Sequence, residues 1–214
     1  MKKPRVLLAD DHTLVLEGFQ KLLEEHCELV GAVEDGRALV ETAAQTRPDL
    51  ILLDISMPRL NGIDAAKKLK KLLPDVKLIF VTMHADAAYI NEAFRAGASG
   101  YLLKQSAATE LMQAVHSVMS ENFYVTPLIA KDVVTSFLNP AQLSSGTLGD
   151  LTTRQREILQ LVAEGFSAKE IADQLQVSHR TVEFHKAKIM EQLGLHTTVD
   201  LIKYAMAHGL ISAT

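Results

Sequence analysis

Residues 49–62 read DLILLDISMPRLNG, and this stretch decides the fold of the first half of the chain. The unbroken apolar run from Leu50 to Leu53 is typical of a parallel strand that is buried on both faces. The run ends at Asp54, and a loop follows at once and closes at Gly62. In open α/β sheets, ligands bind at the carboxyl ends of the strands, where side chains reach solvent from a rigid support. Asp54 is therefore the first candidate for a reactive group.

Four further strand-like runs surround this one, and amphipathic segments alternate with them. The alternation predicts repeated strand–helix units around a five-stranded, doubly wound parallel sheet. Right-handed crossovers would then place the carboxyl ends of all strands at one edge of the sheet. The predicted strands are 5–9, 29–33, 50–53, 77–81 and 100–103, and the predicted helices are 13–25, 36–46, 62–73, 87–96 and 107–120.

Polar side chains follow four of these strands at the edge where Asp54 lies. Asp10 and Asp11 follow the first strand, Thr82 the fourth and Lys104 the fifth. Each has an ordinary structural explanation, as a helix cap, a turn cap or a solvated charge. Their recurrence at the same end of successive strands favours a common site instead.

The chemistry of these side chains suggests a metal-dependent phosphorylation site. Three carboxylates repel one another at close range, but their oxygens are the ligands that a hard divalent cation such as Mg²⁺ prefers. Asp54 would then be free to attack phosphorus and form an acyl phosphate. Lys104 and Thr82 would bind the other phosphoryl oxygens.

The residues just named, with Met57-Pro58 in the loop and Tyr101 in the fifth strand, resemble the receiver domain of bacterial two-component response regulators. The resemblance implies that a sensor histidine kinase donates a phosphoryl group to Asp54. It further implies a Mg²⁺ site formed by Asp10, Asp11, Asp54 and the backbone carbonyl of Ser56. It also implies a switch in which Thr82 moves toward the phosphate and Tyr101 turns inward, although Tyr101 also fits an ordinary half-buried strand position.

A connecting segment separates this half from the next. Residues 127–138 have the pattern of a short helix, which Asn139-Pro140 ends, and LSSGTLGD at 143–150 has the composition of a flexible connection. We therefore divide the chain into a receiver at 1–121, a linker at 122–149 that includes the short helix, and a second domain at 150–214.

The second domain has the pattern of a small helical unit. Its first helix is capped by Thr152 or Thr153 and ends at Gly165. A short helix at 168–175 and a third helix capped by Ser178 follow, and this succession predicts a helix-turn-helix. A last helix is predicted at 198–208. Periodicity alone also fits a generic helical bundle. The segment resembles the LuxR-type DNA-binding domain at Leu151-Thr152, Arg156-Glu157, Gly165, 169–172, Ser178, Thr181-Val182 and His185.

The third helix of this domain is the expected DNA reader, because the resemblance implies that it enters the major groove. Arg180, Lys186 and Lys188 suit phosphate contacts, although they also fit solvated surface charges. Glu183 replaces a residue that is commonly basic in this family, and a glutamate can accept from a cytosine amino group. We therefore expect weak monomer affinity and an unusual operator. The candidate contacts are His179, Arg180, Thr181, Glu183, Phe184, Lys186, Ala187 and Lys188.

Composition narrows the class of protein. Hydrophobic residues make up 48% and charged residues 22% of the 214 residues, and no apolar run approaches the length of a membrane span. The apolar run near the N-terminus is too short for a secretory signal, and one cysteine, Cys27, fits a reducing compartment as an inert thiol. We expect a cytoplasmic protein that does not contact a membrane. The net charge of −4 restricts DNA binding to a local face.

Together, the two resemblances predict a response regulator of the NarL/FixJ class that is not an enzyme. We expect phosphorylation of Asp54 to favour a homodimer on promoter DNA, with RNA polymerase as a further candidate partner. The unphosphorylated receiver would either cover the third DNA-binding helix or keep the protein monomeric. Two alternatives stay open. One is a phosphorylation-independent DNA-binding protein whose receiver is a dimerisation scaffold. The other is a Mg²⁺-dependent phosphatase, which Ser56 disfavours because such enzymes usually carry a second acid there.

Overall fold

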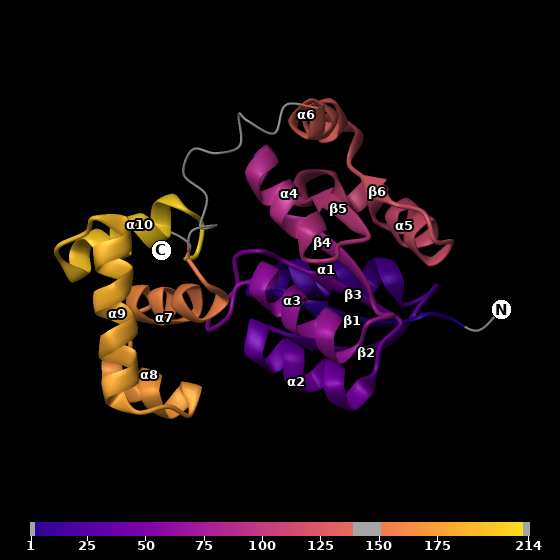
Figure 1. The fold of residues 1–214 in the computed structure, drawn as a ribbon. Coiled ribbons are helices and arrows are strands. Elements are labelled where there is room, and N and C mark those ends of the chain that lie inside the picture. Colours follow the sequence, from indigo (N-terminus) through magenta and orange to yellow (C-terminus); the bar gives the residue numbers. More distant parts are fainter. Residues whose placement is uncertain (1–2, 139–150, 212–214) are drawn as a thin grey trace.

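The computed structural model describes residues 3–138 and 151–211. The first part of the chain forms one parallel sheet with the strand order β2-β1-β3-β4-β5-β6, and a helical domain packs beside it (Figure 1). The strands are β1 (Arg5–Ala9), β2 (Glu28–Val33), β3 (Leu50–Leu53), β4 (Lys77–Thr82), β5 (Gly100–Leu103) and β6 (Tyr124–Val125).

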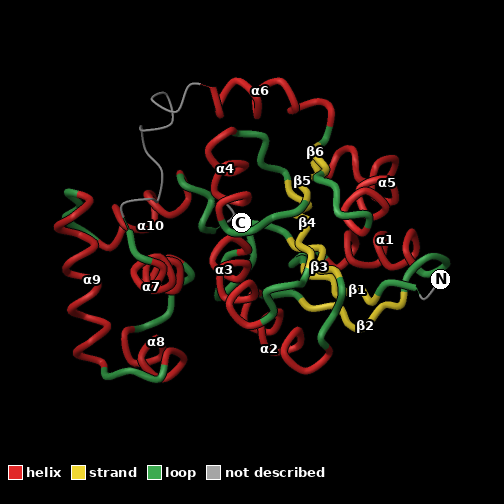
Figure 2. Tube along the Cα trace, turned by 45° about the vertical axis from the view of Figure 1, so that its right-hand side comes forward, coloured by secondary structure: helices red, strands yellow, loops and turns green. Residues whose placement is uncertain are grey.

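Five α-helices cover the two faces of the sheet, which lies between them in Figure 2. All four side chains of β3 are buried, as expected for a strand that is covered on both sides. One apolar core joins the sheet to α2, α3 and α4, and a second joins it to α1 and α5. The helices are α1 (Thr13–Leu23), α2 (Gly36–Thr46), α3 (Gly62–Leu72), α4 (Ala87–Arg95) and α5 (Ala107–Met119), and a 3₁₀ turn, η1 (Lys104–Ser106), precedes α5. The predicted doubly wound architecture is confirmed.

The sheet has a sixth strand where the sequence pattern predicts only five. Tyr124 and Val125 pair with Gly100 and Tyr101 of β5. The buried Thr126 hydroxyl then accepts from the backbone N–H of Leu103 at 3.0 Å. A strand of two residues is too short to show as an apolar run, so the pattern could not reveal it. This strand lies in the stretch that the sequence analysis assigned to the linker.

The predicted short helix is α6 (Pro127–Leu138), and it packs against the receiver core near α4. Ile129 and Val133 are buried in the same core as Ile90 of α4. Residues 139–150, which include the predicted LSSGTLGD connection, lie outside the described residues.

The second domain contains four capped helices. Thr152, not Thr153, caps the first of them through a reciprocal capping box with Gln155. Ser178 caps the third by accepting from the N–H of Thr181, as predicted. Apolar side chains from all four helices form the core of the domain. The helices are α7 (Thr153–Ala163), α8 (Ala168–Leu175), α9 (His179–Leu193) and α10 (Thr198–Ala207).

Within the described residues, none of the helices combines the length and the apolar character that a membrane crossing requires.

Candidate phosphorylation and DNA-binding sites

The four charged residues predicted to share one edge of the sheet do lie together. Asp10 and Asp11 follow β1, Asp54 follows β3, and Lys104 follows β5. The Lys104 ammonium lies 2.7 Å from a carboxylate oxygen of Asp10 and 2.7 Å from one of Asp54. Asp10 is 2% and Asp54 4% exposed, so both carboxylates have little direct access to solvent.

The buried position of this cluster and the charges within it change the pKa values of Lys104 and Asp10. Burial disfavours the charged form of Lys104, but the charges and hydrogen bonds of Asp54 and Asp10 outweigh burial and raise the pKa of Lys104. Burial raises the pKa of Asp10 despite its contacts with Lys104 and the backbone of His12. The contact with Lys104 therefore does not fully offset the effect of burial on the Asp10 carboxyl.

The donor set suits a hard divalent cation. Oxygen atoms of Asp10, Asp11 and Asp54, together with a ring nitrogen of His12, lie within 4.8 Å of one another. Asp11 is partly exposed, which leaves the cluster open on one side. The convergence of three carboxylates, one of them with a raised pKa, provides ligands of the type that Mg²⁺ binds.

The two predicted switch residues are both buried beside this cluster. Thr82 ends β4 and is fully buried. Tyr101 is fully buried in β5, and its hydroxyl donates to the backbone carbonyl of His84 at 2.8 Å. Burial, reinforced by the negative charge of Asp54, raises the pKa of Tyr101, so the phenol stays protonated. Tyr101 therefore points inward in this structure.

His84 is a residue whose central position the sequence analysis did not foresee. Its ring nitrogen Nε2 lies 2.9 Å from the Ser56 hydroxyl, and the ring stacks on Tyr89 at a centroid distance of 4.2 Å. The Ser56 hydroxyl also donates to the carbonyl of Gly209, in the DNA-binding domain, at 3.3 Å. Since a serine has one hydroxyl hydrogen, both contacts are satisfied together when His84 carries its proton on Nε2. His84 thus connects the loops after β3 and β4 with the second domain.

The predicted DNA-reading helix, α9, presents most of its candidate residues to solvent. His179, Arg180, Glu183, Phe184, Ala187 and Lys188 are exposed, and Thr181 and Lys186 are half-buried. Val182 and Ile189 face the domain core instead. In Figure 1, α9 lies on the side of α7 that faces away from the receiver. The expectation that the receiver covers this helix is therefore wrong for this structure, because the receiver contacts α7 instead.

A buried ion pair joins α7 to the receiver. The Arg156 guanidinium makes two hydrogen bonds to the Asp64 carboxylate in α3, at 2.7 and 3.0 Å. Asp64 is fully buried, and burial opposes its ionisation, but the hydrogen bonds and charge of Arg156 outweigh burial and lower the pKa of Asp64. Burial disfavours the charged form of Arg156, but its hydrogen bonds to Asp64 and the charge of Asp64 outweigh burial and raise the pKa of Arg156. Both groups are therefore charged, and Arg156 is the main partner that compensates Asp64, with the Lys67 ammonium a further 3.3 Å contact.

Four further contacts extend this interface along α7. Glu157 accepts from Arg37 at 3.2 Å and from Lys68 at 3.0 Å, both in the receiver. Gln160 accepts from the Asn61 backbone N–H at 2.9 Å and donates to the Met57 carbonyl at 2.7 Å. The loop that follows Asp54 is thus hydrogen-bonded directly to the first helix of the second domain.

Sequence reasoning did not identify this interface. In the sequence, Arg156-Glu157 matches only the LuxR-type pattern, and nothing there relates Asp64 to Gln160 or Arg156. The polar residues Gln155, Arg156, Glu157 and Gln160 are what a solvent-facing side of a helix normally carries, so no local pattern signalled a second packed face.

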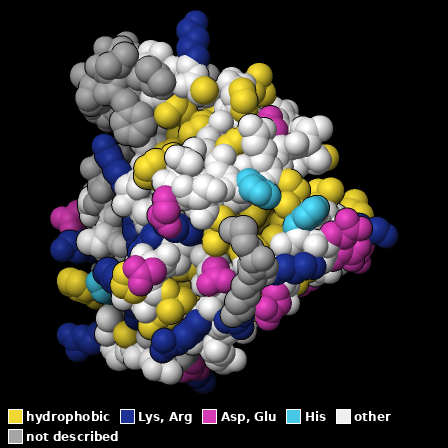
Figure 3. Space-filling view, turned by 90° about the vertical axis from the view of Figure 1, so that its right-hand side faces the viewer, with side chains coloured by type: hydrophobic (Ala, Val, Ile, Leu, Met, Phe, Trp, Pro, Cys, Tyr) yellow, Lys and Arg dark blue, Asp and Glu magenta, His cyan; other side chains and the backbone are white. Residues whose placement is uncertain are grey.

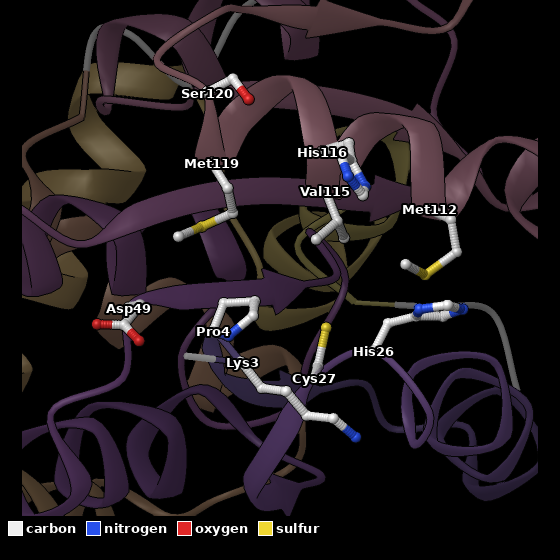
Figure 4. A pocket seen from close by; sticks show the side chains of 10 residues that line it. All are labelled: Lys3, Pro4, His26, Cys27, Asp49, Met112, Val115, His116, Met119 and Ser120. Atoms are coloured by element: carbon white, nitrogen blue, oxygen red, sulfur yellow. The ribbon is translucent and has the colours of Figure 1, made fainter. Parts of the chain in front are cut away.

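A cavity of about 500 Å³ lies at the opposite end of the sheet, away from the acidic cluster (Figure 4). Its lining includes Cys27, whose thiol is buried, and burial raises the pKa of that thiol. A thiol with a raised pKa is a poor nucleophile, which agrees with the expectation that Cys27 is inert. The cavity lining also contains Lys3, Pro4, His26, Asp49, Met112, Val115, His116, Met119 and Ser120.

The face of the receiver seen in Figure 3 mixes basic and acidic side chains, so it shows no continuous basic surface for nucleic acid.

Comparison with known proteins assigns both halves of the chain. Residues 6–116 match the family model described as "Response regulator receiver domain", and residues 150–205 match "Bacterial regulatory proteins, luxR family". The oxygen regulatory protein NreC of Staphylococcus carnosus is 35% identical over 214 residues, covering 97% of this chain and 99% of that protein. The transcriptional regulatory protein MctR of Rhizobium johnstonii is 36% identical over 212 residues, covering 98% and 96%.

Solved structures agree with this assignment. A structure of the Salmonella typhimurium RcsB response regulator is 29% identical, covers 97% of this chain and 99% of its own, and has a TM-score of 0.66. A structure of the RcsB–DNA complex is 28% identical over 97% of this chain and 99% of its own, with a TM-score of 0.57. The predicted fold class and the predicted function class are confirmed. The chain belongs to the DNA-binding two-component response regulators that join a receiver domain to a LuxR-type helix-turn-helix domain.

Proposed function

We propose that Asp54 accepts a phosphoryl group from the phosphohistidine of a sensor kinase. A carboxylate oxygen of Asp54 attacks phosphorus, the P–N bond breaks, and the imidazole leaves with the electron pair and takes up a proton. Lys104, 2.7 Å from Asp54, would pair with a phosphoryl oxygen, and the hydroxyl of Thr82, which ends the neighbouring strand β4, would donate to another. This contact between Lys104 and Asp54 is the observation that carries the proposal.

Mg²⁺ is the proposed metal of this site. The carboxylates of Asp10, Asp11 and Asp54 and the backbone carbonyl of Ser56 would hold it, and it would neutralise negative charge as the phosphoryl group approaches. The clustering of the three acids supports this set of ligands. We expect EDTA to abolish phosphorylation by acetyl phosphate and added Mg²⁺ to restore it, as measured by intact mass. Phosphorylation that proceeds at the same rate in EDTA would contradict the metal site.

We propose the following organisation for the chain. Residues 1–121 form the phosphoacceptor domain, residues 122–149 connect the domains, and residues 150–214 bind DNA. The packing of β6 and α6 against the receiver supports an extended contact between the start of the connector and the first domain. A regulator of promoters acts in the compartment that holds the DNA, which supports a cytoplasmic location. RNA polymerase is a further proposed partner at the promoter.

Exposed residues of α9 are the proposed DNA contacts. Arg180 and Lys188 are exposed cations on this helix and suit phosphate oxygens, and Lys186 lies beside them. Glu183 is exposed in the same helix and suits a cytosine amino group, while Phe184 and Ala187 offer apolar contact to a thymine methyl. His179 and Thr181, near the capped N-terminus of α9, complete the proposed surface.

We expect Arg180→Ala and Lys188→Ala each to weaken binding across all DNA sequences and to lower the salt slope by about 1. We expect Glu183→Ala, which removes the acceptor, to lose about 1–3 kcal/mol of discrimination at one base pair. Fluorescence anisotropy at several salt concentrations measures both effects. Lys131→Ala, an exposed lysine in α6, is the control and should change neither. Loss of affinity without any change in salt slope would contradict phosphate contacts at Arg180 and Lys188.

Control by dimerisation is the proposed link between the two domains. Because α9 is already exposed, the receiver has no need to uncover it, and a second bound copy is the remaining source of extra affinity. We expect phosphorylated protein to elute as a dimer in gel filtration and to bind two half-sites. Equal elution with and without acetyl phosphate would instead favour a receiver that is a constitutive scaffold.

Turnover of a phosphomonoester substrate would support the alternative that the protein is a phosphatase.

A further inference from the structure

The cavity that contains Cys27 has no part in phosphoryl transfer or in DNA binding by α9. Its volume of about 500 Å³ lies within the range of about 300–1,000 Å³ that is usual for small-molecule sites. Its walls are the segment before β1, the segment between α1 and β2, the residue before β3, and one face of α5 (Figure 4). The cavity therefore belongs to the receiver alone, at the end of the sheet away from Asp54.

Apolar side chains line the middle of this cavity. Cys27 and Val115 are buried and belong to the apolar core that joins the sheet to α1 and α5. Met112 and Met119 are half-buried and pack against the same core from α5. Methionine side chains adapt their shape to an apolar neighbour, because they are unbranched and polarizable. The middle of the cavity therefore suits an aliphatic chain.

The two ends of the cavity offer different polar groups. In Figure 4, His26 and His116 lie toward one end and Asp49 toward the other. Within residues 3–138 and 151–211, neither of these imidazole rings has a hydrogen-bond or ion-pair partner. An imidazole ring always carries at least one N–H donor, so both rings can donate to a ligand. The Asp49 carboxylate would repel an anion, which favours the histidine end for a negatively charged group.

Lys3 adds a positive charge to the wall of the cavity. Its ammonium donates to the Glu24 carbonyl at 3.3 Å, which holds it near the end of α1. Burial raises the pKa of the Cys27 thiol, and the charge of Lys3 partly offsets that increase. The positive charge therefore acts on groups inside the cavity, and an ammonium with three donors has further hydrogen bonds to offer.

We propose that this cavity binds a small aliphatic carboxylate. The carboxylate accepts hydrogen bonds from His26 and His116 within the field of the Lys3 ammonium, and the aliphatic chain lies over Val115 between the two methionines. A neutral head group would lose the charge-assisted hydrogen bonds, and a cationic one would be repelled by Lys3. Because the site and the acidic cluster lie at opposite ends of the sheet, this ligand and a phosphoryl group on Asp54 can be bound together.

The probe for this site is octanoate, added to the full-length protein with isotope-labelled methionine methyl groups. The NMR signals of Met112 and Met119 report occupation of the cavity. Met83, which follows β4 at the other end of the sheet and is 71% exposed, reports non-specific adsorption. We expect saturable shifts at Met112 and Met119 and none at Met83. Octanol has the same chain and a neutral head, and we expect it to bind about tenfold more weakly than octanoate.

The double variant His26→Ala/His116→Ala tests the head-group contacts. Both histidines are exposed, so their truncation leaves the core intact. We expect the variant to bind octanoate about tenfold more weakly than the wild type and to bind octanol equally well. His196→Ala removes an exposed histidine from the second domain, and this control should bind octanoate as the wild type does.

The possible results separate the parts of the proposal. Saturable shifts at the two cavity methionines, with a preference for octanoate that the double variant loses, support it. Equal affinity for octanoate and octanol overturns the assignment of an anionic ligand. An unchanged affinity of the double variant for octanoate overturns the assigned head-group contacts. Shifts of the same size at Met83, or no shift at Met112 and Met119, overturn the site itself.

Discussion

Asp54→Asn abolishes the phosphoryl adduct of about 80 Da that acetyl phosphate and Mg²⁺ produce on the wild-type protein. An amide oxygen is a poor nucleophile, and the substitution also removes the carboxylate that pairs with Lys104 at 2.7 Å. Intact mass spectrometry measures the result. Asp75→Asn changes an exposed carboxylate elsewhere in the receiver and should leave the adduct in place. Persistence of a full adduct on Asp54→Asn would assign the phosphoacceptor to another residue.

Arg156→Ala separates the two domains. The substitution removes the guanidinium that pairs with the fully buried Asp64 carboxylate and leaves it only the Lys67 ammonium at 3.3 Å, and breaking a buried pair in this way costs about 3–5 kcal/mol. Exposing Asp64 to water removes the penalty, so undocking is the favourable response. Faster hydrogen exchange at the Asn61 amide, which is bonded to Gln160 across the interface, measures the separation.

Arg156 also donates to the Leu151 carbonyl within its own domain, so the single variant needs a control. The double variant Asp64→Asn/Arg156→Met removes both charges together and should dock more firmly than Arg156→Ala, because neither charge is then buried alone. Equal exchange in the single and double variants would show that the ion pair does not hold the domains together.

The pH dependence of this ion pair follows from the lowered pKa of Asp64. A carboxyl whose pKa is lower in the docked state stabilises docking above its free pKa of about 3.9. That stabilisation is lost as the pH falls from about 3.9 through the lower docked value. Docking measured by Asn61 exchange should therefore be independent of this group near neutral pH.

Much of the fold and of the acidic site was predictable because periodic, local signals encode them. The apolar run at 50–53 and the residues at the ends of β1, β3, β4 and β5 follow the period of a parallel sheet, so the carboxyl ends meet at one edge. The capping residue Ser178 is also a local signal, and the structure uses it as expected.

The sequence could not show which surfaces the domains present to each other. The pair Asp64–Arg156 joins residues 92 positions apart, and no local pattern relates them. In the sequence, Gly209 looks like any glycine that follows a helix. Only the structure shows that Tyr89 and His84 lie against it. The exposure of α9 depends on the same long-range packing, which explains why the expected covering of that helix was wrong. The strand β6 could not be predicted, because two residues are too few to show a strand pattern in the sequence.

The central claim is that the phosphorylation state of Asp54 controls DNA binding by α9. The most direct test is the affinity of unphosphorylated and phosphorylated protein for a DNA sequence selected by the phosphorylated form from a random library, with Asp54→Asn measured in parallel. We predict at least about tenfold tighter binding after treatment with acetyl phosphate and Mg²⁺, within the usual range of allosteric coupling, and no change for Asp54→Asn. Equal affinity of the two forms, with the adduct on Asp54 verified by mass, would contradict the account.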